Sequence, residues 1–144
     1  MLDPIEHYSI PHLAHIETTY LCNSRCVFCY NPEKKYIIDY DKLDKIVAAV
    51  KKARVPHVYL IGGEPSLLKI EKLNEYINDL SKTSSVTIVT NGKIYLKNLS
   101  KKLACIGIPI HGNKETHEYL TNSINSYLQI IKNIKRYVKE GFDV

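Results

Sequence analysis

One short segment dominates the sequence: Cys22-Asn-Ser-Arg-Cys26-Val-Phe-Cys29-Tyr30, which holds three of the four cysteines in the spacing C-x3-C-x2-C. Thiolate sulfur is a preferred ligand of zinc and of iron–sulfur clusters. Three thiolates so close together can wrap one metal centre, but they do not fill a four-coordinate site or ligate every iron of a cubane cluster. We therefore expect either a fourth ligand from elsewhere in the chain or one coordination position left open for chemistry.

Two other interpretations of the same cysteines stay open at this point. A structural zinc site could recruit His12, His15 or a more distant residue as its fourth ligand, or the thiols could stay unligated. Disulfide pairing is less favoured, because three cysteines cluster while Cys105 stands far off in the sequence. In a reducing compartment such a cluster more often binds metal or does redox chemistry.

Length and composition describe an ordinary globular domain. The chain has 144 residues, which is enough for one domain with one core, and 44% of them are apolar. No apolar run approaches the roughly 20 residues that a membrane span needs. The N-terminus, residues 1–7, carries acids and a proline and does not resemble a secretory signal. We therefore expect a cytoplasmic protein with no membrane partner.

The net charge of +5 comes from 20 basic and 15 acidic residues. The lysines are spread over several predicted helices, as in Lys51-Lys52 and Lys101-Lys102, and are not gathered on one segment. Such a distribution is typical of solvated helix faces. The eleven tyrosines are also scattered, without the pattern of a base-stacking surface. No nucleic-acid partner is expected.

Strands and helices are predicted to alternate along the whole chain. Helices show apolar residues at a 3.6-residue period, as in Leu43, Ile46, Val47 and Val50. Strands are short, apolar runs rich in β-branched residues. The predicted strands span 14–19, 57–61, 86–89 and 105–110, and the predicted helices span 41–54, 69–82, 94–103 and 125–140. This alternation predicts an α/β fold with parallel strands joined by right-handed crossovers.

Three unusual segments each follow a predicted strand. The cysteine segment follows the first, Gly62-Gly63-Glu64-Pro65 follows the second, and Thr90-Asn91-Gly92 follows the third. Functional loops of parallel sheets and barrels gather at the carboxyl ends of the strands. The three segments are therefore expected at one edge of the sheet, where they would form a single active site.

The end of the chain reads as the opening of another strand, Phe142-Asp143-Val144, after a helix capped at Gly141. Four strand–helix units do not close an eight-stranded barrel, and they leave the fourth strand as an open edge. We therefore expect residues 1–144 to be a single domain that is truncated at the start of a fifth strand, or that needs another chain.

The cysteine segment resembles the C-x3-C-x-aromatic-C signature of radical S-adenosylmethionine (radical SAM) enzymes. Gly62-Gly63-Glu64 is similar to that family's GGE motif after the second strand. Residues 106–144 resemble the family's fourth strand–helix unit. The combination covers most of the chain and is far more specific than the cysteines alone. It implies about four units of a partial (β/α)6 barrel, which is a TIM-like fold.

The resemblance implies a [4Fe–4S] cluster and S-adenosylmethionine as cofactors. Cys22, Cys26 and Cys29 would each ligate one iron, and S-adenosylmethionine would chelate the fourth. An electron would cleave the cofactor to methionine and a 5′-deoxyadenosyl radical, which abstracts hydrogen from a substrate. The resemblance also implies a low-potential electron donor such as flavodoxin or ferredoxin. The substrate stays open, with peptide modification or cofactor biosynthesis suggested by analogy only.

The family's pattern also assigns roles to Gly62, Gly63 and Glu64. The two glycines would let the backbone approach a ligand closely, and Glu64 would accept hydrogen bonds from the ammonium group of S-adenosylmethionine. The alternative for this segment is a plain strand-to-helix turn, in which Glu64 is favoured near a helix N-terminus.

Four further positions are implicated. Phe28 would shield the cluster and pack near the adenine, and the backbone around Tyr30 could touch the same ring. Thr90 and Asn91 are polar groups suited to the ribose or the methionyl part, although Asn91 also belongs to a common turn dipeptide. Where such enzymes often carry a serine, this chain has Pro109, so one cofactor contact is expected to be lost or moved.

Three remaining residues carry structural alternatives. Cys105 is expected to be a buried apolar residue. His111 could meet substrate or belong to a surface turn, and His117 is expected to cap or pack the loop before the last helix. The alternative to an enzyme is a non-catalytic iron–sulfur or zinc-binding module, or an inactive fragment of a split assembly.

Overall fold

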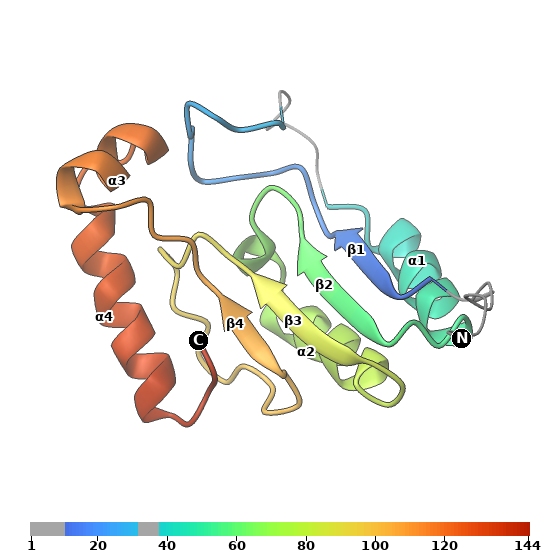
Figure 1. The fold of residues 1–144 in the computed structure, drawn as a ribbon. Helices are drawn as coiled ribbons and strands as arrows, with labels where there is room; N and C mark the ends of the chain where they lie inside the picture. Colours follow the sequence, from blue (N-terminus) through green and yellow to red (C-terminus); the bar gives the residue numbers. More distant parts are fainter. Residues whose placement is uncertain (1–10, 32–37) are drawn as a thin grey trace, which may run out of the picture.

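The computed structural model describes residues 11–31 and 38–144, so the N-terminal segment used for the cytoplasmic expectation lies outside the described residues. Strands and helices alternate along the chain, as Figure 1 shows. In chain order the elements are β1 (Leu13–Glu17), α1 (Tyr40–Lys52), β2 (His57–Ile61), the short 3-10 helix η1 (Pro65–Leu67), α2 (Ile70–Leu80), β3 (Ser85–Val89), β4 (Cys105–Gly107), α3 (Lys114–Thr121) and α4 (Ser126–Lys139).

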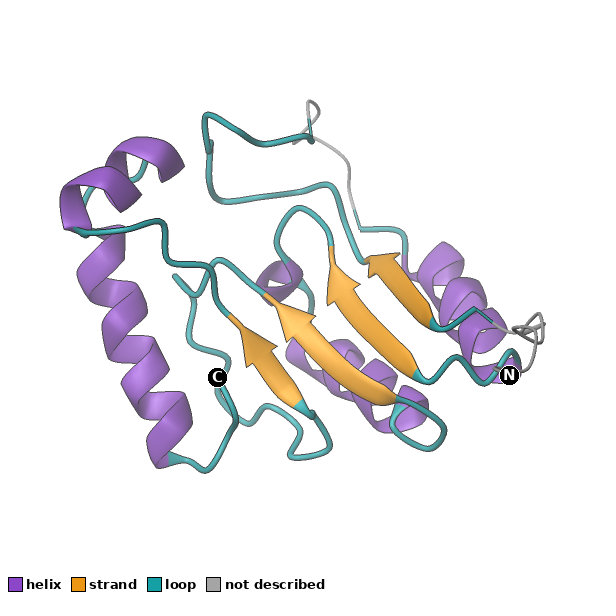
Figure 2. Ribbon diagram, viewed as in Figure 1, coloured by secondary structure: helices purple, strands orange, loops and turns teal. Residues whose placement is uncertain are grey.

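The four strands form one sheet in the order β1-β2-β3-β4, and every neighbouring pair is parallel. The predicted α/β fold with parallel strands is therefore confirmed. All four strands point the same way, and the loops that follow them lie at one edge of the sheet (Figure 2). We call this the carboxyl edge. The spatial order equals the chain order, so each connection joins neighbouring strands.

The core lies between the sheet and helices α1 and α2, which Figure 1 shows on one face of the sheet. Alternate strand residues point to this face, because side chains of a strand alternate between its two faces. Val58, Leu60, Val86, Ile88 and Ile106 are completely buried there. The opposite strand residues are only partly buried or exposed. One face of the sheet is therefore packed, while the other is more open.

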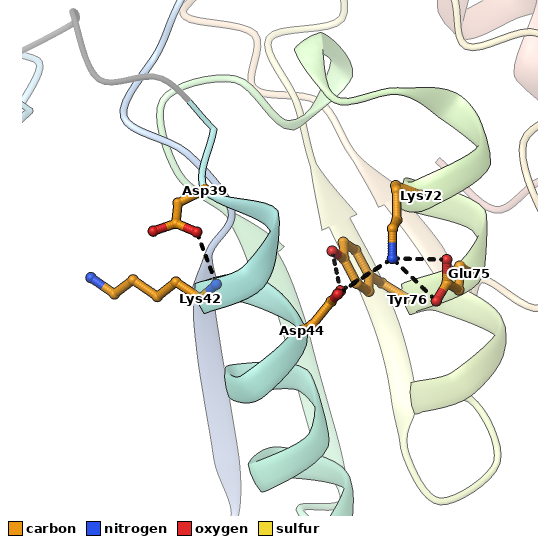
Figure 3. A network of polar contacts seen from close by, with 6 residues as sticks. All are labelled: Asp39, Lys42, Asp44, Lys72, Glu75 and Tyr76. Carbon is orange, nitrogen blue, oxygen red and sulfur yellow. Dashed lines mark hydrogen bonds and ion pairs between the residues drawn. The ribbon is translucent and has the colours of Figure 1, made fainter.

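A polar network joins α1 to α2 at the outer surface of this layer (Figure 3). Asp39 caps α1 by accepting a hydrogen bond from the Lys42 backbone N–H at 3.0 Å. Asp44 accepts from the Tyr76 hydroxyl at 2.6 Å and pairs with Lys72 at 3.3 Å. Tyr76 is buried, so this hydroxyl needs the carboxylate as its partner. The network fixes how the two helices pack.

The predicted helix over 94–103 is wrong. The segment is a series of turns, and Asn98 has a left-handed backbone with φ 61°. Leu96 and Leu99 are nevertheless buried, and the segment is held by contacts with both α2 and α4. The Leu96 backbone N–H donates to the Tyr137 hydroxyl at 2.8 Å.

Helix α3 is an addition, because the sequence analysis assigned no helix to 114–121. The Asn113 side chain caps it by accepting from the Thr116 N–H at 2.9 Å, and Asn122 ends it in the left-handed conformation. Residues 142–144, where the sequence suggested the start of a fifth strand, are not a strand in the structure, although the Ile106 N–H donates to the Asp143 carbonyl at 2.8 Å. Residues next to the C-terminus therefore hydrogen-bond to β4.

Within the described residues, no helix has both the length and the apolar character to cross a bilayer.

Candidate active site

The chain leaving β1 is joined to the end of β2 by backbone contacts. Gly63 N–H donates to the Thr19 carbonyl at 2.5 Å, and Glu64 N–H donates to the Leu21 carbonyl at 2.8 Å. A Cβ atom on Gly62, which has φ 137°, would lie 2.5 Å from the Thr19 oxygen. A side chain at either glycine would therefore push the two segments apart. The sequence predicted that the two glycines let the backbone approach a ligand closely. In the structure they approach the protein's own backbone at residues 19–21. Their contact with a cofactor stays a prediction.

Glu64 connects the end of β2 to the end of β3. Its side chain is buried, with 1% of the residue exposed. The carboxylate accepts hydrogen bonds from Ser66 N–H at 3.0 Å, from the Thr90 hydroxyl at 2.5 Å and from Asn91 N–H at 2.7 Å. These donors compensate for the cost of burying a charge. The structure thus brings together Glu64, Thr90 and Asn91, three of the residues that the sequence singled out.

The cysteine loop, residues 20–31, is held against the end of β3. Asn91 Nδ2 donates to Asn23 Oδ1 at 2.6 Å and to Ser24 Oγ at 3.3 Å. Lys93 Nζ donates to the Asn23 carbonyl at 2.6 Å. Glu64 fixes the Asn91 backbone, so a chain of hydrogen bonds runs from β2 through β3 to the cysteine loop. The sequence analysis did not assign any role to Lys93.

Helix α3 holds the other side of the cysteine loop. The Val27 N–H donates to the Leu120 carbonyl at 2.9 Å. Phe28, which is 54% exposed, places its ring edge-on against His111, with 4.8 Å between ring centroids. The loop is therefore supported from β3 on one side and from α3 and the end of β4 on the other.

Cys22, Cys26 and Cys29 lie on this loop outside any disulfide, and each is at least partly accessible. The Ser24 N–H approaches Cys22 Sγ at 3.4 Å, and Cys29 Sγ approaches the Asn31 carbonyl at 3.8 Å. Among the described residues, no three His, Cys, Asp or Glu side chains converge tightly enough for a single metal ion. A cubane cluster takes one thiolate at each iron, so its ligands stand apart and do not converge on one point.

The two histidines considered as a fourth zinc ligand lie on or next to β1. His12 contacts the His57 ring and His15 contacts the Tyr59 ring, with centroid distances of 5.5 and 5.3 Å. Within the part of the chain that the structure describes, they do not combine with the cysteines into a metal-ion site.

A cavity of about 240 Å³ opens beside Cys26, between the cysteine loop, the end of β4 and helices α3 and α4. Phe28, Asn91 and Pro109 contribute to its walls, together with Ser24, Lys93, His111, His117, Thr121, Ser126 and Ile130. The cavity therefore brings a cysteine of the motif together with residues from the ends of β3 and β4. A larger cavity of about 620 Å³ lies between β1 and α1, and no cysteine lines it.

Tyr30 is not among the residues that line this cavity. Its ring is largely exposed, and its hydroxyl donates to Glu17 Oε1 on β1 at 3.1 Å. Partial burial of the hydroxyl, followed by the neighbouring Glu17 carboxylate, raises the pKa of Tyr30. The predicted contact of its backbone with an adenine ring stays a prediction.

Sequence comparison gives one family model, Radical SAM superfamily, which matches residues 16–144. The GTP 3′,8-cyclase of Aquifex aeolicus is 31% identical over 145 residues, and the alignment covers 90% of this chain and 44% of that enzyme. An uncharacterised protein of Archaeoglobus fulgidus is 30% identical, with 74% of this chain and 27% of the relative covered. The chain spans less than half the length of these relatives.

Solved structures give the same fold. SuiB of Streptococcus suis, bound to S-adenosylmethionine, superposes with a TM-score of 0.74 at 20% identity, over 93% of this chain and 33% of SuiB. TYW1 superposes with a TM-score of 0.61 at 19% identity, over 90% of this chain and 52% of that protein. These neighbours belong to radical SAM barrels, so the parallel sheet is part of a TIM-like barrel fold. Members of the family use a [4Fe–4S] cluster and S-adenosylmethionine. The chain belongs to the radical SAM superfamily, because the family model covers nearly all of it.

Proposed function

We propose that this protein is a radical SAM enzyme whose cofactors bind at the carboxyl edge of the sheet. When bound, the reduced [4Fe–4S] cluster supplies one electron that splits S-adenosylmethionine into methionine and a 5′-deoxyadenosyl radical, which takes a hydrogen atom from the substrate. The electron comes from a low-potential donor such as flavodoxin or ferredoxin. The observation that carries the proposal is the cysteine loop itself, held by hydrogen bonds to Asn91 and to the Leu120 carbonyl beside a cavity that Cys26 lines.

The residues present fit these cofactors. Three cysteines without a disulfide lie on one supported loop, and soft sulfur ligands suit iron. The adjacent cavity of about 240 Å³ has room for part of a ligand, and Cys26 lines it. Both features favour a site that takes an additional group over a loop that is merely structural.

Each residue has a separate task in this proposal. Cys22, Cys26 and Cys29 hold three irons as thiolates. Phe28 covers the mouth of the cavity and limits access of water, because its ring leans on His111. Gly62 and Gly63 set the position of the loop, while the Tyr30 backbone contacts the adenine.

Glu64, Thr90 and Asn91 form the polar part of the proposed cofactor site. The Glu64 carboxylate already accepts three protein hydrogen bonds, so it first orients Asn91 and the end of β3. We assign to it one further hydrogen bond from the ammonium group of S-adenosylmethionine, since two carboxylate oxygens offer about four acceptor positions. Thr90 and Asn91 then complete the polar wall towards the ribose or the methionyl part.

The relatives act on unlike substrates, as their names show: one is a GTP 3′,8-cyclase and SuiB has been solved with the precursor peptide SuiA. Our proposal therefore covers cofactor cleavage and hydrogen abstraction, with a substrate from peptide modification or cofactor biosynthesis. The proposal applies to the whole protein. We also propose that the protein works in the cytoplasm, where conditions are reducing.

The proposal is tested on the full chain after anaerobic reconstitution. We expect close to four irons and four sulfides per chain for a [4Fe–4S] cluster, and 5′-deoxyadenosine after addition of dithionite and S-adenosylmethionine. Cys26→Ala is expected to abolish both the cluster absorbance and the 5′-deoxyadenosine. Cys105→Ala is the matched control, because Cys105 is a free cysteine outside the loop and should leave both signals intact.

Two outcomes would contradict the proposed function, and a third would contradict the ligand assignment. Zinc bound without sulfide would favour the alternative of a structural zinc-binding module. A full cluster that yields no 5′-deoxyadenosine under these conditions would favour the inactive-fragment alternative. Cleavage that persists in Cys26→Ala would show that the ligand assignment is wrong.

A further inference from the structure

A carboxylate without a positively charged partner lies at the carboxyl end of β1. Glu17 is the last residue of that strand, and it points to the open face of the sheet, because its neighbour Ile16 is buried on the helix-covered face. The ion pairs found among the described residues lie on or next to α1 and α2, and none of them includes Glu17. The negative charge of Glu17 is therefore available to a bound cation.

Two tyrosines bring phenol oxygens to this carboxylate. The Tyr30 hydroxyl donates to Glu17 Oε1 at 3.1 Å. A hydrogen bond to Glu17, together with the charge of the carboxylate, raises the pKa of Tyr20, so this phenol is neutral at pH 7. Tyr20 is 45% exposed and Tyr30 is 69% exposed, so an incoming ligand can reach the group. A carboxylate has about four acceptor positions, so the two phenols leave room for further N–H donors.

Glu17 and Tyr20 also line the cavity of about 620 Å³ between β1 and α1. The other ionisable residues that line it are His15, Asp39 and Lys42. Two carboxylates and one ammonium group give the lining a net negative charge when His15 is neutral. The remaining walls are apolar or carry hydroxyl groups. A cavity with this lining favours a ligand that has a positive charge at one end and an organic body.

This site suits an organic cation better than a metal ion. Ca²⁺ and Mg²⁺ take six or more oxygen ligands, often from several carboxylates, whereas no three His, Cys, Asp or Glu side chains converge in the part of the chain that the structure describes. An ammonium or guanidinium group needs acceptors for its N–H donors and one negative charge. The Glu17 carboxylate and the neighbouring phenol oxygens supply both.

We propose that Glu17, together with Tyr20 and Tyr30, binds an ammonium or guanidinium group of the substrate. The inference rests on the proposed function and adds a substrate class to it, namely organic molecules that carry a basic group. Tyr30 directly follows Cys29, and Tyr20 lies two residues before Cys22. A cation bound at Glu17 therefore holds the rest of the substrate next to the cysteine loop.

The probe for this site is n-butylguanidinium, and N-butylurea is its neutral counterpart of similar shape. Dissociation constants are measured by anaerobic isothermal titration calorimetry on the reconstituted full chain, with and without saturating S-adenosylmethionine and in the absence of a reductant. We expect the natural protein to bind n-butylguanidinium at least about tenfold more tightly than N-butylurea, because only the cation forms charge-assisted hydrogen bonds with the carboxylate. This comparison needs no variant.

Glu17→Gln keeps the size of the side chain and an acceptor for the Tyr30 hydroxyl, but it removes the charge. We expect this variant to bind n-butylguanidinium about tenfold more weakly than the natural protein does, with N-butylurea binding changed by less than about twofold. Glu71→Gln, in the exposed first turn of α2, is the matched control and should bind both probes like the natural protein. Iron, sulfide and melting temperature are determined on the same samples.

Several results would overturn the cation site. They are equal affinity of the natural protein for the two probes, natural affinity for n-butylguanidinium in Glu17→Gln, and an equal loss in Glu71→Gln. Displacement of the probe by S-adenosylmethionine would also overturn it, because the site would then belong to the cofactor. A natural protein that forms no cluster or cleaves no S-adenosylmethionine would instead refute the proposed function, whatever its affinity for the probes.

Discussion

Glu64 shows how one carboxylate organises the site at the scale of a residue. Its oxygens satisfy donors from two loops, since Ser66 follows β2 while Thr90 and Asn91 follow β3. The sequence predicted that Glu64 belongs to the site, but it gave no sign that these particular donors occupy the carboxylate. Such pairing depends on the spatial neighbours of each strand end, which a single sequence does not encode locally.

Glu64→Gln tests this role. The Gln amide nitrogen would face at least one protein N–H or hydroxyl donor, so a buried hydrogen bond is lost and a repulsive contact replaces it. We expect the free energy of unfolding to fall by about 2 kcal/mol, measured by urea denaturation. Glu71→Gln, at an exposed position in the first turn of α2, is the control. Equal stability of the two variants would contradict the role assigned to the carboxylate.

Lys93 is the residue that the sequence analysis missed. A lysine after an Asn-Gly turn is common on protein surfaces, so its residue type carried no signal. Its function depends on Asn23, 70 positions earlier in the chain, whose carbonyl it binds. Only the three-dimensional neighbourhood of the cysteine loop reveals this contact.

Lys93→Met keeps the aliphatic stem and removes the donor. We expect faster amide hydrogen exchange in residues 22–29, because one of the supports of the loop is lost, with little change in the exchange of β2 and β3. The measurement is hydrogen exchange read by mass spectrometry. Lys97→Met, an exposed lysine in the same segment, should leave exchange in the loop unchanged. Unaltered exchange in both variants would refute this support.

At the scale of elements, the strands were predicted well and the turns poorly. The strands are apolar runs buried on the helix-covered face, and that pattern is local. The predicted helix over 94–103 failed because Leu96, Leu99 and Leu103 have helical spacing, yet this spacing also suits an irregular segment that contacts both α2 and α4. Asn98 in the left-handed region breaks the helix, and Asn is among the residues that most readily adopt this conformation.

Helix α3 did carry a signal that was passed over. Asn113 precedes a run with Glu115 in its first turn, and Asn122 follows it. Asn is a favoured N-cap residue, an acidic first turn suits the helix dipole, and Asn is accepted in a left-handed C-terminal position. The polar composition of the run hid the helix, because only His117 and Thr121 on it are buried.

The α1–α2 interface gives a prediction with a defined pH dependence. The hydrogen bond from the Tyr76 hydroxyl, followed by Lys72, lowers the pKa of Asp44 below its ordinary value of 3.8, although partial burial opposes this. A carboxyl whose folded pKa is depressed stabilises the fold above its unfolded pKa, and this stabilisation is lost as the pH falls through the folded pKa. Asp44→Asn should therefore lower the melting temperature at pH 7, and the deficit should shrink below about pH 4.

Melting curves at several pH values check this expectation. Asp41→Asn serves as the control, since Asp41 lies in the exposed first turn of the same helix. If the difference in melting temperature between Asp44→Asn and the natural protein stayed constant down to pH 2, the charge of the Asp44 carboxylate would not be the source of the stabilisation.

At the scale of the whole molecule, the C-terminal residues are part of the fold. The Asp143 carbonyl accepts from Ile106 on β4, and Phe142 is buried against the Tyr137 ring at 5.9 Å. Lys101 Nζ lies over the face of the Phe142 ring, 3.5 Å from its centroid. The sequence predicted that a fifth strand starts here; residues 142–144 are not a strand in the structure, so the fifth strand stays a prediction.

Phe142→Ala measures what this segment contributes. Removing a buried phenylalanine leaves a cavity, so we expect the free energy of unfolding to fall by about 3 kcal/mol. Val144→Ala, two residues on and 43% exposed, should change it by less than about 0.5 kcal/mol. Urea denaturation followed by circular dichroism provides both values, and similar losses in the two variants would contradict a specific role for Phe142.

The backbone contacts that Gly62 and Gly63 make with residues 19–21 have a consequence for how the protein regains a cluster lost to oxidation. They tie the start of the cysteine loop to the end of β2, so the position of this part of the loop depends on backbone hydrogen bonds that oxygen does not attack. A protein that loses iron and sulfide to oxidation would therefore keep the start of the loop in place. Reconstitution would then need iron, sulfide and a reductant, but no refolding of this segment.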